Sequence, residues 1–151
     1  MKRSQLQNKE VLQNNQDVVS RNGRYHLRMQ SDGNLVLYQK DRPLWASNTK
    51  GKGVGPFRLV VQSDNNLVVY DNNAKVVWAN NVYIGNDGQH WDKQGFASLK
   101  DDGNFVVYDG ANELMWETAT NGGRQGIYGF GRKHQKKGFF YISKVGQNKI
   151  K

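Results

Sequence analysis

One nine-residue pattern occurs three times in this chain of 151 residues, and it constrains the fold more than any other feature. It reads QSDGNLVLY at 30–38, QSDNNLVVY at 62–70 and KDDGNFVVY at 100–108. An apolar segment precedes each copy, and a tryptophan lies seven or eight residues beyond each tyrosine. Such a repeat indicates a small unit that cannot bury its apolar face alone and packs against its own copies. We therefore expect three similar units around a common axis.

Each copy predicts two strands joined by a tight turn. The turn sequences SDGN, SDNN and DDGN supply Asp, Asn and Gly, which tolerate positive φ and hydrogen-bond to the backbone. Beyond the turn, successive side chains point to opposite faces of the strand. Leu35 and Leu37 then lie on an apolar face, whereas Asn34, Val36 and Tyr38 lie on the other. The second and third copies follow the same alternation, so the sequence predicts an all-β fold with threefold pseudosymmetry.

Three tryptophans follow the three copies, at Trp45, Trp78 and Trp116. Because a tryptophan buries a large area, we expect these side chains to fill the common axis. No apolar run approaches the roughly 20 residues that span a bilayer. The chain has no cysteine, and its basic start, MKRSQLQNKEVLQNN, lacks the apolar stretch of a signal peptide. These features predict a cytoplasmic or unconventionally secreted protein.

The net charge of +9 is concentrated at one end of the chain. From Gly122 onward there are eight Lys and Arg residues and no Asp or Glu, whereas the rest holds 14 basic and 13 acidic residues. We therefore divide the chain into a repeat-containing domain, 1–120, and a basic, aromatic extension, 121–151. The extension is interpreted first as an added strand with solvated lysines, then as a contact for an anionic membrane or other acidic partner. Nucleic acid ranks last. We expect the aromatic run GFFYISK to dock and the basic run GRKHQKK to stay free.

The polar face of every copy repeats the same chemistry. An Asp carboxylate accepts hydrogen bonds, Asn and Gln amides donate and accept, and a Tyr hydroxyl does either. The valine adds an exposed apolar patch for C–H groups. This set suits a monosaccharide, which presents pairs of hydroxyls around an apolar patch. Turn geometry and packing explain a single copy, but three copies that keep Asp, Asn, Val and Tyr favour binding, because the turn requires neither the valine nor the tyrosine.

The pattern Gln-x-Asp-x-Asn-x-Val-x-Tyr resembles the mannose-binding signature of the bulb-type, or monocot mannose-binding, lectins. The resemblance covers roughly residues 5–120 and includes PLWASNT after the first copy and the W-x-T-x-T sequence of Trp116, Thr118 and Thr120. It implies a β-prism II fold of three four-stranded antiparallel sheets. It also implies multivalent, metal-independent carbohydrate binding, with no cofactor and no catalysis.

The resemblance assigns a role to each motif residue of the first copy. Asp32 and Asn34 would hold the axial 2-hydroxyl of mannose, Gln30 the 3-hydroxyl and Tyr38 the 4-hydroxyl. Val36 would pack on the sugar ring. The second copy matches completely and implies a second site, formed by Gln62, Asp64, Asn66, Val68 and Tyr70.

The third copy departs from the signature at its first position. Lys100 stands where glutamine is expected, before four matching residues, Asp102, Asn104, Val106 and Tyr108. A lysine donates hydrogen bonds but cannot accept them, so we expect this site to be weaker or altered. The cysteine staple of plant members is missing. The resemblance further implies a homodimer formed by exchange of the C-terminal strand, here LMWETAT.

Other functions were weighed against binding mannose or mannose-rich glycans. Catalysis is disfavoured because His26, His90 and His134 are scattered, and each motif supplies one carboxylate rather than the close pair of a glycosidase. The alternative within the family is a cytoplasmic adaptor or a membrane- or cytoskeleton-linking protein. A second alternative is a lectin-like antibacterial protein. Each of these proteins would act through the basic extension.

Overall fold

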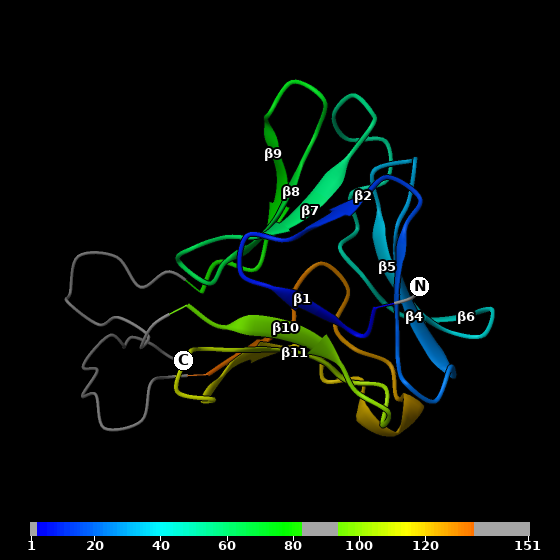
Figure 1. Ribbon diagram of the computed structural model, residues 1–151. Coiled ribbons are helices and arrows are strands. Elements are labelled where there is room, and N and C mark those ends of the chain that lie inside the picture. Colours follow the sequence, from blue (N-terminus) through cyan, green and yellow to red (C-terminus); the bar gives the residue numbers. More distant parts are fainter. Residues whose placement is uncertain (1–2, 83–93, 135–151) are drawn as a thin grey trace, which may run out of the picture.

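In the computed structural model, which describes residues 3–82 and 94–134, the regular secondary structure of the described chain is β-strand apart from one short 3₁₀ turn. Figure 1 shows three antiparallel sheets arranged as the sides of a triangular prism. The predicted all-β fold with threefold pseudosymmetry is confirmed. Two sheets have four strands, as expected, and the other gains a short fifth strand from the C-terminal segment.

Each sheet contains one repeat unit of three consecutive strands. The first unit comprises β4 (Tyr25–Met29), β5 (Leu35–Gln39) and β6 (Arg42–Ala46). The second comprises β7 (Arg58–Val61), β8 (Leu67–Tyr70) and β9 (Val76–Ala79). The third comprises β10 (Phe96–Leu99), β11 (Phe105–Tyr108) and β12 (Leu114–Glu117). In every unit the motif's turn joins the first two strands, and the middle strand carries the motif's valine and tyrosine.

The N-terminal segment contributes one strand to each sheet. These strands are β1 (Gln5–Gln7), β2 (Val11–Gln13) and β3 (Asp17–Val19), which pair with β10, β7 and β4 respectively. Each has a single fully buried residue at its centre: Leu6, Leu12 and Val18. The constant spacing of six residues gives each sheet one apolar side chain for the core. This segment therefore ties the three repeat units together.

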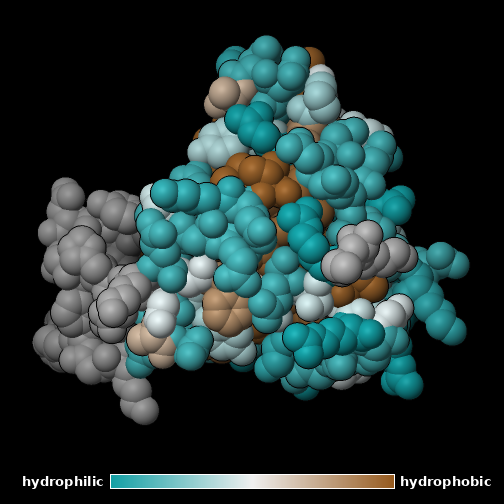
Figure 2. All heavy atoms as spheres, in the orientation of Figure 1, coloured by the Kyte–Doolittle hydropathy of each residue, from teal (hydrophilic) through white to brown (hydrophobic). Residues whose placement is uncertain are grey.

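The three tryptophans meet at the axis, as predicted. The ring centroids of Trp45 and Trp78 lie 5.4 Å apart, those of Trp45 and Trp116 5.7 Å, and those of Trp78 and Trp116 5.9 Å. All three pairs are edge-to-face, an arrangement that adds to the free energy of burial. Figure 2 shows hydrophilic residues over most of the viewed surface and hydrophobic residues gathered towards its centre.

The segment after β12 covers the tryptophans. It contains a short 3₁₀ turn (Asn121–Gly123) and β13 (Arg132–Lys133), and its orange trace crosses the middle of the prism in Figure 1. The indole N–H groups of Trp45 and Trp78 donate to the carbonyl oxygens of Phe130 and Gly129, each at 3.0 Å. A Cβ atom on Gly131 would lie 2.4 Å from the ring of Trp116, so only glycine fits there.

The expectation that the basic run stays free is wrong for its first residues. β13 pairs with β12, with Arg132 opposite Glu117 and Lys133 opposite Trp116. The reason is that β12 would otherwise present an unpaired edge, which this short strand covers. The aromatic run GFFYISK lies outside the described residues, and the division of the chain at residue 120 stays a prediction. None of the described helical segments is long and apolar enough to cross a membrane.

Candidate functional site

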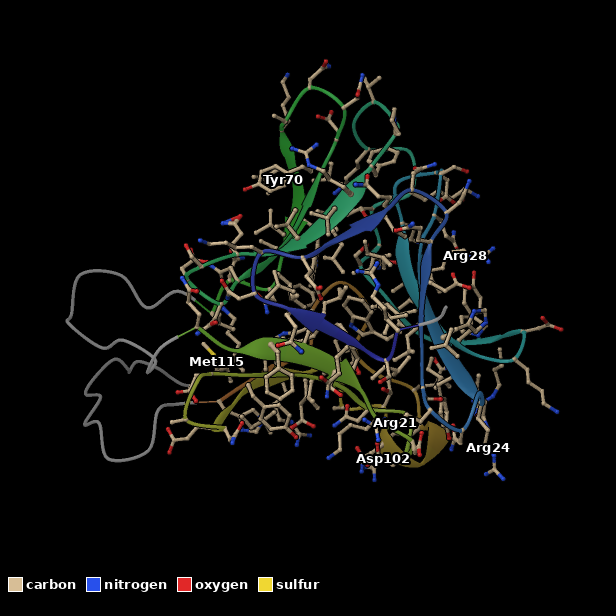
Figure 3. The ribbon with its side chains drawn as sticks, viewed as in Figure 1. Arg21, Arg24, Arg28, Tyr70, Asp102 and Met115 are labelled. Carbon is tan, nitrogen blue, oxygen red and sulfur yellow. The ribbon has the colours of Figure 1, made fainter. Side chains whose placement is uncertain are left out.

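The three motif copies lie on the outward-facing sides of the three sheets. Figure 3 labels one residue near each copy, and Arg28, Tyr70 and Asp102 lie on different sides of the prism. The apolar side chains of each copy point inward, and Leu35, Leu67 and Phe105 are fully buried. The outward faces therefore present three separate polar surfaces that cannot contact a single small ligand together.

The polar side chains of the first copy are bonded to one another. The Tyr38 hydroxyl donates to Oε1 of Gln30, and Nε2 of Gln30 donates to both carboxylate oxygens of Asp32 at 3.2 Å. The Asp32 carboxylate also accepts from the backbone N–H of Asn34 at 3.0 Å, which fixes the turn. Burial and then the nearby Asp32 charge raise the pKa of Tyr38, so its hydroxyl keeps its proton. The face is thus ordered before any ligand arrives.

Asn34 is held from below by the segment after β6. Its Oδ1 accepts from the hydroxyl of Ser47 and from the backbone N–H of Thr49, both at 3.2 Å. Ser47 and Thr49 are buried and hydrogen-bond to each other at 2.7 Å. No described residue accepts a hydrogen bond from Nδ2 of Asn34, so this amide nitrogen is the group that remains for a ligand.

The three motif valines are not the exposed patch that the sequence suggested. Val36, Val68 and Val106 are only 4%, 5% and 1% exposed, which corrects that expectation. Each lies between neighbouring strands, and for Val36 the cross-strand partners are Arg28 and Ala46. These neighbours cover the sides of the valine, so it forms a narrow apolar floor between the polar groups.

The second copy reproduces the first in its central bonds. The Tyr70 hydroxyl donates to Oε1 of Gln62, and the Asn66 backbone N–H donates to Asp64 at 3.0 Å. Oδ1 of Asn66 accepts from the backbone N–H of Val82 at 2.7 Å, and its Nδ2 lies 3.3 Å from Asp64. The guanidinium of Arg58 lies over the Tyr70 ring at 5.0 Å, a cation–π contact that fixes the ring.

The third copy is altered by a residue outside the motif. Glu117 lies opposite Val106, whereas Ala46 and Ala79 hold the equivalent positions opposite Val36 and Val68. Its carboxylate accepts from Nδ2 of Asn104 at 2.8 Å. One of the two N–H donors of this amide is therefore used by Glu117, whereas no described residue accepts from the amide of Asn34 on the first face.

Glu117 also joins the third face to the C-terminal segment. Its Oε2 lies 2.7 Å from Nε2 of His134 and 3.9 Å from Arg132. Burial acts to raise the pKa of Glu117, but the hydrogen bonds from Asn104 and His134 outweigh it, so the pKa lies below its ordinary value. Lys100 is exposed and offers no acceptor to Tyr108, unlike Gln30 and Gln62.

Comparison with known proteins identifies this arrangement. No family model matches the chain. Over 85 residues, however, it is 36% identical to a mannose-specific lectin from Aloe arborescens, an alignment that covers 56% of this chain and 75% of that protein. The chain belongs to the monocot mannose-binding lectin family.

Solved structures agree with this assignment. A monomeric monocot mannose-binding lectin from Gastrodia elata aligns with a TM-score of 0.67 and 33% identity, covering 78% of this chain and 98% of that one. The snowdrop (Galanthus nivalis) agglutinin complexed with methyl-α-D-mannoside aligns with a TM-score of 0.58 and 35% identity, covering 70% and 88%. The predicted β-prism II fold is thereby confirmed for this lectin.

Two supports of the lectin's motif faces were missed from the sequence. One is a pair of residues that hold the motif asparagine, the first through its hydroxyl and the second through its backbone N–H: Ser47 and Thr49 in the first copy, Thr118 and Thr120 in the third. The other is Glu117. Aligning the segments WASNT, WANN and WETAT shows both features. Hydroxyl residues occupy the second and fourth positions after the tryptophan in the first and third segments, and Glu117 replaces an alanine immediately after the tryptophan.

The histidines of this lectin do not assemble a common centre in the described chain. His26 lies beside the first motif, His134 lies at the third, and His90 falls outside the described residues. Within residues 3–82 and 94–134, no three His, Asp or Glu side chains gather in a way that holds a metal ion.

Proposed function

We propose that this protein binds mannose, or glycans that end in mannose, at its first and second motif faces and without a metal ion. The observation that carries the proposal is a group of Gln, Asp, Asn and Tyr on two faces that shares the Tyr–Gln and Asn–Asp hydrogen bonds. A site whose side chains are already held in place loses less conformational entropy when a ligand binds. Membership in the monocot mannose-binding lectin family and the mannoside complex of the snowdrop relative support the choice of sugar.

The first face offers one group for each hydroxyl that a mannose ring presents along one edge. Nδ2 of Asn34 donates and the Asp32 carboxylate accepts, so together they hold the axial 2-hydroxyl that distinguishes mannose from glucose. Gln30 binds the 3-hydroxyl and Tyr38 the 4-hydroxyl, each exchanging part of its internal bond for one to the sugar. The narrow floor at Val36 contacts the C–H groups of the ring.

The second face acts in the same way through its complete motif. Gln62, Asp64, Asn66 and Tyr70 take the corresponding roles, over the floor formed by Val68. A shallow site of this kind exchanges each hydrogen bond against water, so we expect a dissociation constant of about 1 mM for one sugar.

The third face differs, and we propose that it does not bind mannose in the same manner. Asn104 gives one of its two Nδ2 protons to Glu117, and this carboxylate lies opposite Val106, where the other two faces have an alanine. Lys100 supplies no acceptor, and Tyr108 and Val106 alone cannot orient a ring. The useful sites are therefore two, and they point away from each other.

A glycan array with the full-length protein tests the proposal. Mannose-terminated glycans should retain the protein, free mannose should displace it, and free glucose should not. A parallel array with EDTA should give the same signal, because no metal takes part. Equal displacement by mannose and glucose, or loss of signal in EDTA with circular dichroism unchanged, would contradict the assignment.

The assembly of the protein is a finer proposal. Two sites on different faces gain affinity only when one glycan carries several mannose termini, where linkage adds a factor of about 10². A homodimer by strand exchange would have to displace β13, which already covers the outer edge of β12. Light scattering that shows a monomer together with strong agglutination would assign the avidity to the two faces of one chain.

An acidic partner for the C-terminal segment is also proposed, on a specific observation. Ile127 and Phe130 are 69% and 70% exposed, and the basic residues Arg124, Arg132 and Lys133 are exposed in the same segment. Exposed apolar and basic side chains together suit an anionic surface. Sedimentation with anionic vesicles that disappears at high salt supports this, and equal sedimentation with neutral vesicles opposes it.

A further inference from the structure

A cavity lies beside the axial tryptophans, under the C-terminal segment. Its volume is about 320 Å³, which falls within the range of pockets that bind small molecules. Trp78 and Asn80 line it from the second unit, Trp116 lines it from the third, and Gly131 and Lys133 line it from the C-terminal segment. No lining residue belongs to a motif copy, so this cavity is separate from the three motif faces.

Trp116 is the axial tryptophan whose indole nitrogen has no partner. The N–H groups of Trp45 and Trp78 donate to carbonyl oxygens of the C-terminal segment, each at 3.0 Å. Within residues 3–82 and 94–134, no group accepts a hydrogen bond from Nε1 of Trp116, although this residue is only 1% exposed. A buried tryptophan N–H ordinarily has a partner. The cavity beside this ring therefore has room for an acceptor that the described chain does not supply.

Asn80 provides a second unpartnered donor at the same cavity. It is 4% exposed, and its Oδ1 accepts from the backbone N–H of Leu67 at 3.1 Å, but its Nδ2 has no partner in the described chain. The equivalent residues of the other units, Ser47 and Thr118, donate through their hydroxyls to the motif asparagine. The second unit thus carries an unpaired amide donor where the other two carry a satisfied hydroxyl. Leaving a buried donor unpaired is unfavourable, and an acceptor in the cavity relieves it.

The charge at the cavity is positive. Lys133 lies opposite Trp116 in the pairing of β12 with β13, and it lines the cavity, whereas none of the described lining residues is acidic. Glu117 follows Trp116 and so points to the other side of the strand, where Arg132 and His134 contact it. The cavity therefore combines two unpaired N–H donors, one ammonium group and two indole rings. This combination suits a ligand with an anionic acceptor at one end and an apolar body at the other.

We propose that this cavity is a binding site for a small carboxylate with an apolar body, such as an arylalkanoate or a short alkanoate. The carboxylate accepts from Nε1 of Trp116 and Nδ2 of Asn80, close to the ammonium group of Lys133. The apolar body packs against the ring of Trp78. The site goes beyond sugar binding and does not depend on it. Because its walls come from both the core and the C-terminal segment, the ligand joins the two and stabilises the folded protein.

Calorimetric titration of the full-length protein with phenylacetate and hexanoate tests the proposal, and phenylacetamide is the neutral match for phenylacetate. At least one carboxylate should bind at one site per chain and raise the melting temperature. The amide should bind about tenfold more weakly than phenylacetate, because a charged acceptor makes stronger hydrogen bonds. If neither carboxylate binds, or if the amide binds equally well, the proposal is overturned. Displacement of the carboxylate by methyl α-mannoside would place it at a motif face and would overturn the proposal too.

The chain itself offers variants that test the walls. Asn80→Ser copies Ser47 and removes Nδ2 while keeping an acceptor for the backbone of Leu67, so it should weaken phenylacetate binding about tenfold. Lys133→Gln should weaken it about threefold, since this ammonium group is exposed to solvent. Arg132→Gln is the matched control on the opposite side of β13 and should change the affinity less than about twofold.

Thermal denaturation and circular dichroism establish that each variant is folded before its affinity is measured. Unchanged affinity in folded Asn80→Ser would show that the amide does not contact the ligand and would overturn the site. A loss in Arg132→Gln equal to that in Lys133→Gln would overturn the placement of the carboxylate, because it would reflect the net charge of the segment rather than the cavity.

Discussion

Replacing Lys100 by glutamine and Glu117 by alanine is expected to make the third face a working copy of the first. Alanine is the residue opposite the motif valine in the other two units, at Ala46 and Ala79. The Glu117→Ala change releases Nδ2 of Asn104, and Lys100→Gln supplies the missing acceptor. The double variant should therefore bind one additional monosaccharide per chain.

The magnitude of the accompanying loss in stability follows from the contacts of Glu117. Glu117 is only 8% exposed, and its carboxylate makes hydrogen bonds of 2.8 Å with Asn104 and 2.7 Å with His134. Hydrogen bonds to a charged group each contribute about 1.5–3 kcal/mol, and water will replace part of this in the opened site, so we expect a loss of about 2–4 kcal/mol in unfolding free energy. For a domain of this size the melting temperature should fall by roughly 10 °C.

Calorimetric titration with methyl α-mannoside measures the number of sites, and thermal denaturation measures the loss. Two single variants serve as controls. Lys100→Gln alone should add no site, because Asn104 remains bonded to Glu117, and Glu117→Gln should keep an acceptor and leave the face closed. The reasoning is refuted if Lys100→Gln alone opens the site, or if the folded double variant binds no more sugar than the wild type.

Other expectations concern the motif, the pH response and the C-terminal segment. Asp32→Ala and Asp64→Ala should each remove one site in calorimetry and lower the unfolding free energy by about 1 kcal/mol, because the turn loses a hydrogen bond. The double variant should no longer be retained by mannose, and its retention would contradict the site assignment. The Glu117 pKa lies below its ordinary value of 4.5, so its stabilising effect is complete above that value and is lost as the pH falls through the lowered pKa. The difference in unfolding free energy between wild type and Glu117→Gln should accordingly shrink below about pH 4.5, and a difference that is constant down to pH 3 would oppose this. Deleting residues 122–151 should uncover Trp45 and Trp78, shift tryptophan emission to the red and lower the melting temperature; unchanged emission would show that the segment does not cover the axis.

The repeat made most of the architecture predictable. Three copies of one unit, each with a buried face and a following tryptophan, admit few packings other than a threefold arrangement with the tryptophans at its centre. The N-terminal strands were harder to recognise, because a strand of three residues is too short for alternation to show. Only the spacing of Leu6, Leu12 and Val18 marks them, and it gains meaning once each is known to pair with a different sheet.

The candidate sites were predictable in their composition but not in their surroundings. The motif placed Gln30, Asp32 and Tyr38 on one face, and the structure brings them into hydrogen-bonding contact. The influence of Glu117 on Asn104 acts between residues 13 positions apart in the sequence, through the pairing of β11 and β12. Such an effect depends on strand register, which the buried face and the turn between β11 and β12 set together, so the motif by itself does not show which residue lies opposite Val106.

The three faces show how one repeat can acquire different functions without losing its fold. The buried side chains and the turn are shared, so they keep the core and the threefold geometry unchanged. The strand opposite the motif is free to vary, and it places His26 and Arg28 at the first face, Arg58 at the second and Phe96 at the third. Because His26, Arg58 and Phe96 each pack against the motif tyrosine on the outward face, their exchange changes what lies beside a bound sugar. A difference in ligand preference between faces that share every motif residue should therefore follow the opposite strand, and exchanging that strand's outward residues between faces should transfer the preference.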